Sequence, residues 1–290
     1  MNDLTAVDIL VNPDGTTLGR ARAWNARMRA SVPEGFALDA SHHPHITTLQ
    51  RYVRTAGLDD VYEAVHRTLA ATDTGALTYR AVALGHADWG VPGQGLAAIL
   101  LRPGPQVLDF QAALLAAVSP FTGSGGTAAA FVTDPGEDIS RSTLDWVDGY
   151  VPAQIGPGRY TAHITVGFAT LGDLEAVEAE PFEAFTVRPA AVAVHQLGNS
   201  GARPHAPAEL AHPGLTGPAG HPPAHRRVRY AVGCAGNPPA GPPGTVGLPS
   251  GGSGLVCGGS VGRVPARRPW WERSCCPGVR RGGGSCPGAV

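Results

Sequence analysis

The chain has 290 residues and a formal net charge of −1, but this balance hides two segments of different composition. Residues 1–200 contain 12 Arg against 21 Asp and Glu, a net charge of −9, whereas residues 201–290 contain 10 Arg against two Glu, a net charge of +8. Glycine and proline make up 32 of the first 200 residues and 35 of the last 90. The composition therefore predicts a globular domain over 1–200 and a disordered tail over 201–290, and it excludes a chain that folds uniformly along its length.

Cysteine usage and hydropathy exclude several classes of function. All five cysteines lie after residue 200, so the globular segment has no thiol nucleophile, disulfide or thiolate metal ligand. No stretch approaches the roughly 20 apolar residues that span a bilayer, and the N-terminus lacks the basic and apolar regions of a signal peptide. We therefore expect a cytoplasmic protein with no membrane partner.

The first part of the globular segment alternates between two hydrophobic periods. Apolar runs rich in β-branched residues predict strands, and apolar residues spaced at three and four predict helices. In chain order the predicted elements are a strand at 6–11, a helix at 18–30, a strand at 45–53, a helix at 58–69 and strands at 77–84 and 96–101.

The second part repeats this order. Helices at 105–118 and 144–151 are followed by a strand at 160–168, a helix at 171–180 and a strand at 185–197. Both the strand at 45–53 and the strand at 160–168 contain His-Ile-Thr and lead into a helix and another strand, which we interpret as an internal duplication. The predicted fold class is α+β: two lobes of duplicated strand-helix-strand units with a central cleft, followed by the disordered tail.

The two His-Ile-Thr segments are His45-Ile46-Thr47 and His163-Ile164-Thr165. Eleven His and 32 Ser and Thr predict roughly one His-x-Ser/Thr match by chance, so the three observed matches prove little by number alone. In a strand, however, residues i and i+2 project from the same face, so each His points the same way as its Thr. The third match, His66-Arg67-Thr68, falls in a predicted helix, where those positions do not share a face, and His66 is interpreted as a surface histidine.

Two strands that each present a His and a Thr, one in each half of a duplicated unit, resemble the 2H phosphoesterase superfamily, which includes the 2′-5′ RNA ligase-like and cyclic phosphodiesterase proteins. The resemblance covers residues 1–200. It implies two lobes facing each other across a cleft, with His45, Thr47, His163 and Thr165 as the catalytic residues. The family's C-terminal lobe normally continues with ordered chain after the strand that corresponds to 185–197, where this sequence enters its tail.

The resemblance also implies a reaction: hydrolysis of a 2′,3′-cyclic phosphate or related phosphodiester on a nucleotide or RNA terminus, without a metal or other cofactor. Ligation of 2′-5′ ends is the reverse chemistry. The residue types suit this reaction, because one imidazole removes a proton from water while the other protonates the leaving oxygen, and an ordinary pKa near 6.5 serves both tasks. The threonine hydroxyls are suited to bonding the non-bridging oxygens. The sequence leaves open which histidine is the acid and which phosphodiester is the substrate.

Two arginines and two tyrosines lie close to these motifs. Arg51 is six residues after His45 and so is expected on the same strand face, and Arg159 is four residues before His163. Either arginine is a candidate phosphate contact, with a solvated strand-end position as the alternative. Tyr52 and Tyr160 could stack on a base, but core packing is favoured.

Two rival functions stay open. The sequence His42-His43-Pro44-His45 allows a metal-dependent hydrolase in which His43 and His45 bind a metal together with His163 or His195, although no carboxylate has matching spacing. The other rival is a non-catalytic module that binds an RNA end. A net charge of −9 on residues 1–200 disfavours an extended nucleic acid duplex as a partner, because few counterions would be released along the phosphate backbone. The sequence does not determine the oligomeric state.

The tail invites two interpretations. Its arginines could tether nucleic acid. The abrupt change in composition, the complete absence of lysine and the clustered cysteines instead favour a shifted reading frame through GC-rich DNA, or an extension without selected function. The cysteines lack metal-ligand spacing and are interpreted as incidental.

Overall fold

The computed structural model describes residues 3–39, 42–88, 91–133, 136, 138–156 and 158–198, together with the backbone of a short strand at Glu209–Leu210. Apart from that strand, the predicted disordered tail at 201–290 lies outside the described residues. Within these ranges, no helix is long and apolar enough to cross a membrane.

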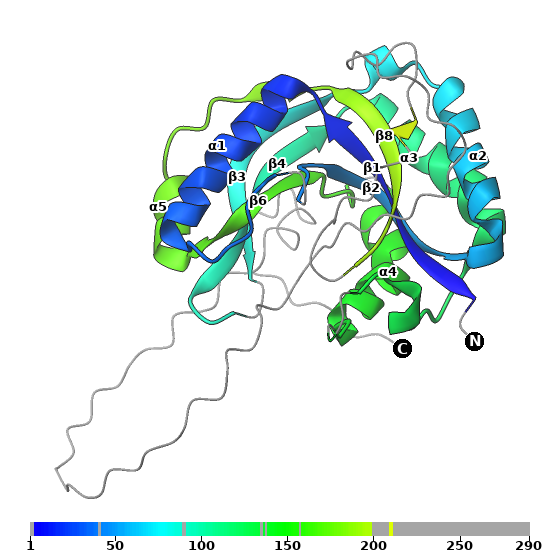
Figure 1. Ribbon diagram of the computed structural model, residues 1–290. Helices are drawn as coiled ribbons and strands as arrows, with labels where there is room; N and C mark the ends of the chain where they lie inside the picture. The colour runs from blue at the N-terminus through cyan, green and yellow to red at the C-terminus, as the bar shows by residue number, and fades with distance from the viewer. Residues whose placement is uncertain are drawn as a thin grey trace, which may run out of the picture.

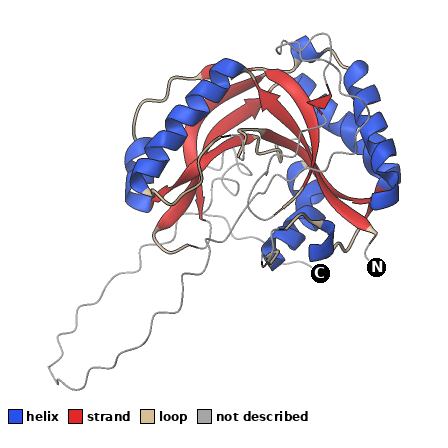
Figure 2. Cartoon of the chain, viewed as in Figure 1, coloured by secondary structure: helices blue, strands red, loops and turns tan. Residues whose placement is uncertain are grey.

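The strands form two antiparallel sheets, which make a curved layer through the molecule (Figure 2). The five-stranded sheet has the order β5-β2-β1-β8-β9. Its strands are β1 (Leu4–Pro13), β2 (Ile46–Arg54), β5 (Thr122–Gly123), β8 (Pro189–Gln196) and β9 (Glu209–Leu210). The four-stranded sheet has the order β6-β4-β3-β7. Its strands are β3 (Tyr79–Asp88), β4 (Gln94–Pro103), β6 (His163–Thr170) and β7 (Phe185–Val187).

Two pairs of helices and a single helix cover the sheets, as Figure 1 shows. They are α1 (Gly15–Ser31), α2 (Leu58–Ala70), α3 (Pro105–Val118), α4 (Arg141–Gln154) and α5 (Leu171–Glu178). Helices α1 and α5 pack on the four-stranded sheet, α2 and α3 pack on each other and on β2, and α4 also contacts β2. Three helices begin at a side chain that accepts a backbone N–H from the first turn, which satisfies a donor that the helix leaves unpaired: Asp14, Ser140 and Thr170.

The predicted duplication is visible in the topology. The order β2-β1-β8 in one sheet matches β6-β4-β3 in the other, so β1 corresponds to β4, β2 to β6, and β8 to β3. In each half the chain crosses to the other sheet after the His-Ile-Thr strand and its helix: α2 leads from β2 directly to β3, whereas α5 leads from β6 to β7 in the same sheet before the chain crosses to β8. The α+β class with duplicated strand-helix-strand units is therefore confirmed.

The prediction of one strand at 185–197 is wrong, because the chain changes sheets within it. Strand β7 pairs with β3, and after Arg188 strand β8 pairs with β1. The crossing is fixed by Asp14, whose carboxylate accepts the backbone N–H of Arg188 at 2.9 Å and whose own N–H donates to the Arg188 carbonyl at 2.9 Å. The sign in the sequence is Arg188-Pro189, because a proline within a predicted strand argues against one continuous strand.

One hydrophobic core joins the two sheets. A single cluster of buried side chains contains Ile9 and Val194 from the five-stranded sheet together with Ile99 and Ile164 from the four-stranded sheet. The central isoleucines of the two motifs, Ile46 and Ile164, are both 0% exposed in this cluster. Burying each isoleucine inward leaves the neighbouring His and Thr to face the other way.

Candidate active site

The two motifs occupy corresponding positions in different sheets. His45 immediately precedes β2 and Thr47 lies in it, whereas His163 begins β6 and Thr165 follows two residues later. All four side chains are half-buried. Strand β2 is next to β1 as β6 is next to β4, so each motif has the same local neighbourhood of strands.

A β-bulge follows each motif at the same point. Thr48 is skipped in the ladder between β1 and β2, and Val166 is skipped in the ladder between β4 and β6. Each skipped residue comes directly after the motif's threonine. A bulge bends the strand and shifts the alternation of side chains by one. The two bulges therefore give both motifs the same local bend and re-aim the residues that come after them.

Both imidazoles are held by the same backbone contact. His45 Nδ1 lies 2.9 Å from the carbonyl oxygen of His43, and His163 Nδ1 lies 2.8 Å from the carbonyl oxygen of Thr161. A carbonyl oxygen only accepts, so in each ring Nδ1 carries the proton and donates it. In the neutral ring Nε2 then keeps its lone pair, which is the arrangement that a general base requires.

The electrostatics of the two histidines are also alike. Burial lowers the pKa of both imidazoles below the ordinary value near 6.5, while the backbone contacts at Nδ1 oppose this effect. His45 further lowers the pKa of His163 by charge repulsion, which places the two rings within electrostatic range of each other. Both rings are therefore neutral at pH 7 before substrate binds.

A small pocket lies between the two sheets and is lined by one residue of each motif, whereas His45 and Thr165 are not among its lining residues. It contains Thr47 from the five-stranded sheet and His163 from the four-stranded sheet. The remaining lining residues come from β2, α4 and the segment before β6: Gln50, Trp146, Tyr150, Gln154, Tyr160 and Thr161. The Tyr160 hydroxyl donates to the backbone carbonyl of Thr47 at 2.7 Å, so the segment leading into one motif is bonded directly to the other.

A polar row beneath Thr47 was not recognised in the sequence. Asp8 in β1 is 0% exposed, and its Oδ2 accepts hydrogen bonds from Thr47 Oγ1 at 2.9 Å and from Gln50 Nε2 at 3.0 Å. Gln50 and His195 are its direct neighbours in β2 and β8. The available signal was a single acidic residue in the otherwise apolar strand Ala6–Val11, but one such residue has no spacing pattern to identify it.

The two candidate phosphate-binding arginines do not reach the pocket. The expectation that Arg51 shares the face of His45 is wrong, because the bulge at Thr48 shifts the alternation and pairs Arg51 with Val7 rather than with Asp8. Its guanidinium donates to Thr122 Oγ1 at 3.1 Å. Arg159 is exposed in the turn before β6, and it donates to the carbonyl of Pro152 at 2.9 Å.

Three other expectations concern Tyr52 and Tyr160, His66 and the metal-dependent alternative. Tyr52 and Tyr160 are buried in the core, as predicted, and the Tyr52 hydroxyl donates to the Leu144 carbonyl. His66 is exposed on α2, as predicted. Among the described residues, no three His, Cys, Asp or Glu side chains lie together in a way that could hold a metal ion. The metal-dependent alternative through His43, His45 and His163 therefore has no assembled ligand set in this part of the chain.

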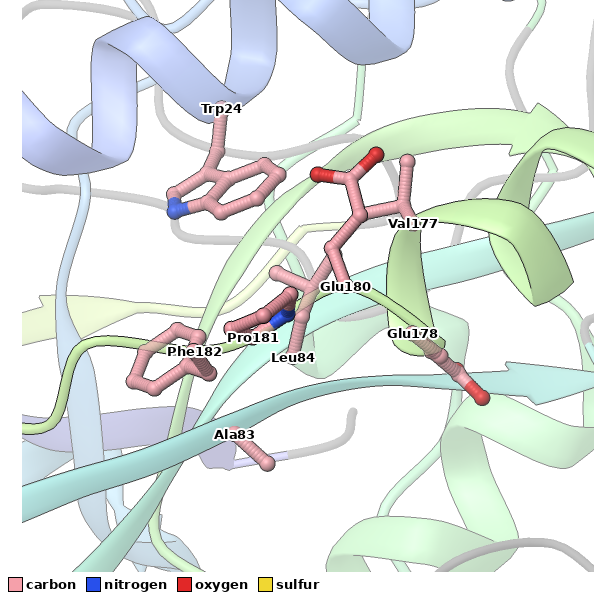
Figure 3. Close-up of a pocket in the computed structure, with 8 residues that line it drawn as sticks. All are labelled: Trp24, Ala83, Leu84, Val177, Glu178, Glu180, Pro181 and Phe182. Carbon is pink, nitrogen blue, oxygen red and sulfur yellow. The ribbon is translucent and has the colours of Figure 1, made fainter.

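A second hollow lies away from both motifs, between α1, β3 and the end of α5 (Figure 3). Trp24 and Phe182 stand on its rim, and Glu178 and Glu180 add acidic groups. Arg27 pairs with Glu180 and lies over the Trp24 ring, so one carboxylate is already neutralised within the protein. This hollow contains none of the predicted site residues.

Comparisons with known proteins add little to this description. No model of a known protein family matches the chain, and no curated protein matches it. A structure of Usb1 from Kluyveromyces marxianus with uridine monophosphate is similar at 9% identity and a TM-score of 0.35, over 67% of this chain and 95% of that one. A second structure of the same protein is similar at 9% identity and a TM-score of 0.33, over 67% and 94%. Similarity at this level assigns neither a fold nor a function to the chain.

Proposed function

We propose that the protein is a phosphodiesterase in which His45 and His163 act as a general acid and base pair on a phosphodiester held between the two sheets. The observation that carries the proposal is the equivalence of the two motifs. Each presents a half-buried His and Thr from a bulged strand, and each His is fixed in the same tautomer by a backbone carbonyl. Two imidazoles fixed alike, in opposing sheets, suit a reaction that needs proton removal and proton donation on opposite sides of phosphorus.

The chemistry follows from the protonation of the two rings. One neutral imidazole takes a proton from water through Nε2, and the water attacks phosphorus. The other ring must be protonated to donate to the leaving oxygen, although burial favours its neutral form. The negative charge of a bound phosphodiester raises the pKa of a nearby imidazole and so supplies the acid form within the complex. In this proposal the Thr47 and Thr165 hydroxyls bond the non-bridging oxygens, where negative charge accumulates.

The proposed substrate is a 2′,3′-cyclic phosphate or related phosphodiester on a nucleotide or RNA terminus, and 2′-5′ ligation is the reverse reaction. The small pocket and the net charge of −9 on residues 1–200 suit a compact phosphodiester better than an extended duplex. A cytoplasmic location and independence from metal are parts of the same proposal. Neither Arg51 nor Arg159 has a role in it.

The test is hydrolysis of a 2′,3′-cyclic nucleotide by the full chain in the presence of excess chelator. Replacing His45 or His163 by Ala should each lower kcat by roughly 100- to 10,000-fold, because each removes one proton-transfer partner. His66→Ala is the matched control, since His66 belongs to the third His-x-Thr match but lies exposed on α2. Turnover abolished by the chelator would favour the metal-dependent alternative, and ligand binding without turnover would favour the RNA-end binding module.

A further inference from the structure

Asp8 is a buried carboxyl group directly beneath the proposed phosphate site. It lies in β1, between β2 and β8, and is 0% exposed. Its Oδ2 accepts the Thr47 hydroxyl and the Gln50 amide, whereas its Oδ1 is also buried and has no hydrogen-bond partner among the described residues. A buried carboxylate with an unbonded oxygen is costly, so these surroundings favour the protonated acid.

Among the described residues, no charged group contributes to the shift in the pKa of Asp8, and Arg51 on the neighbouring strand β2 donates to Thr122 Oγ1. On β8 its neighbour is His195, whose pKa burial lowers to about 3, so that ring is neutral at any ordinary pH. His43 and His45 lie close enough to His195 to lower its pKa further by charge repulsion, and burial keeps His45 neutral. The charged groups of α4 that act on Tyr52, on the neighbouring strand β2, are Asp145 and Asp148, which raise its pKa, and Arg141, which lowers it. The short helix Ala128–Ala130, which also contacts β1, has no titratable side chain.

The Thr47 hydroxyl has only one proton to donate. When Asp8 is ionised, that proton is donated to Oδ2, and the threonine presents its lone pairs to the pocket. When Asp8 is protonated, the carboxyl group can donate to Thr47 Oγ1, and the threonine proton becomes free for a phosphate oxygen. Burial raises the pKa of Asp8 to about 7, so both forms are populated near neutral pH.

We propose that Asp8 is a positioning residue whose own proton decides whether the Thr47 hydroxyl is turned toward a bound phosphate group. This inference rests on the proposed function, because it assumes a phosphate oxygen in the pocket that Thr47 lines. Asp8 itself touches no substrate and acts only through Thr47. The site accordingly binds phosphate with the neutral form of Asp8 and rejects it with the ionised form.

Sulfate is a suitable probe, because it has the shape of phosphate and its charge is constant between pH 4 and pH 9. Calorimetric titration of the full chain with sulfate, at constant ionic strength, should give a dissociation constant at least tenfold weaker at pH 9 than at pH 6. In Asp8→Asn the amide donates to Thr47 Oγ1 at every pH, so only the titration of the histidines remains, and the change in the dissociation constant should be at least threefold smaller than in the wild type. Both proteins keep His45 and His163, so the difference between their pH dependences isolates Asp8.

Thr47→Val separates positioning from simple charge repulsion. Valine fills the same space without a hydroxyl, so the pH dependence of sulfate binding should fall toward that of Asp8→Asn. If Thr47→Val keeps the full tenfold change, Asp8 acts by its charge alone and the proposal is overturned. It is equally overturned if the wild type shows less than a threefold change, or if Asp8→Asn retains the wild-type change.

A measurement on the wild type alone guards against a variant that fails to fold. Carbon NMR of the chain labelled at aspartate carboxyl groups should show one resonance that titrates near pH 7, with its midpoint moved upward by saturating sulfate. No such shift would contradict the proposal. The sulfate experiments need no turnover, so the two proposals can fail separately. Normal hydrolysis together with no effect of Asp8→Asn on sulfate binding would refute the role of Asp8 and leave the proposed function standing. Sulfate binding that depends on pH through Asp8, without any hydrolysis, would support the role of Asp8 and refute the proposed function.

Discussion

The two halves of the molecule carry the same His-Ile-Thr motif, but the side chains next to the threonine differ between them. In the first half, the row beneath the threonine is Asp8 with Gln50 and His195, a polar set. The corresponding row in the second half, found by matching the two registers through the bulges, is Leu96, Phe168 and Ala87, an apolar set. The motif, the bulge and the backbone contact at Nδ1 are shared, but within the described part of the chain Thr47 is bonded to a carboxyl group and Thr165 is not. The duplicated fold thus gives two equivalent His-Thr pairs, and the neighbouring residues of each sheet give the two threonines different hydrogen-bond partners.

The largest expected effect tests whether the two threonines do the same work. Thr47→Val and Thr165→Val should each lower kcat on a 2′,3′-cyclic nucleotide by about 100-fold, because each removes a donor to the charged oxygens of the transition state. Steady-state kinetics at pH 6 makes the comparison with Asp8 mostly protonated. Thr68→Val is the control from the chance motif on α2, where the hydroxyl donates only to the Ala64 carbonyl. A loss confined to one threonine would break the equivalence of the halves.

A second effect concerns stability and comes only from the first half. The pKa of Asp8 is about 7 in the folded protein against 3.8 for an ordinary aspartate, so the folded state binds the proton more tightly than the unfolded state. The contribution of Asp8 to the free energy of unfolding is therefore highest where Asp8 is protonated in both states, falls as pH rises from 3.8 toward 7, and levels off above 7. The buried histidines, whose pKa values are lowered, make stability rise with pH up to about 6.5 in both proteins. Between pH 5 and pH 9, urea unfolding should therefore show the wild type losing roughly 2–3 kcal/mol relative to Asp8→Asn.

Asp173→Asn is the control for this measurement. Hydrogen bonds from Ser31 and Thr170 lower the pKa of Asp173, so its contribution is present above the ordinary carboxyl pKa and is lost only in acid. Replacing it should leave the slope between pH 5 and pH 9 unchanged. A wild-type slope that persists in Asp8→Asn would assign the titration to another group.

The smallest effect should be the same in both halves, because it concerns the shared core. Ile46→Val and Ile164→Val each remove one methylene from a side chain that is 0% exposed, and each should lower the free energy of unfolding by about 1 kcal/mol. Chemical denaturation measures both. Val132→Ala, at a side chain that is 38% exposed, should change stability by less than about 0.5 kcal/mol. A large difference between the isoleucines would show that the asymmetry extends into the core.

Much of this fold could be predicted from hydrophobic period, because period reports which residues are buried. The helix predicted at 105–118 matches α3, and the strand predicted at 45–53 lies within one residue of β2. The paired motifs were found because two residues on one strand face leave a trace in the sequence. That β2 and β6 lie in different sheets was implied only by the predicted duplication.

The errors share a physical cause, which is that they depend on partners rather than on local pattern. The bulge at Thr48 depends on the pairing with β1, and in the sequence Thr48 looks like any other β-branched strand residue. Because the bulge shifts the alternation of side chains, Arg51 was predicted on the wrong face of the strand. The change of sheet at Arg188 depends on Asp14, far away in the sequence. The role of Asp8 depends on Thr47 and Gln50, and a lone aspartate in an apolar strand does not name its partners.

The crossing of the chain between sheets makes the halves dependent on each other. Strand β3 completes the sheet of β4 and β6, and β8 completes the sheet of β1 and β2. Neither half of the sequence therefore contains all the strands of one sheet. A chain cut in the hairpin between β3 and β4 would give two fragments that need each other to fold. Because one hydrophobic core also joins the two sheets, both sheets should lose their structure together in a single cooperative unfolding transition.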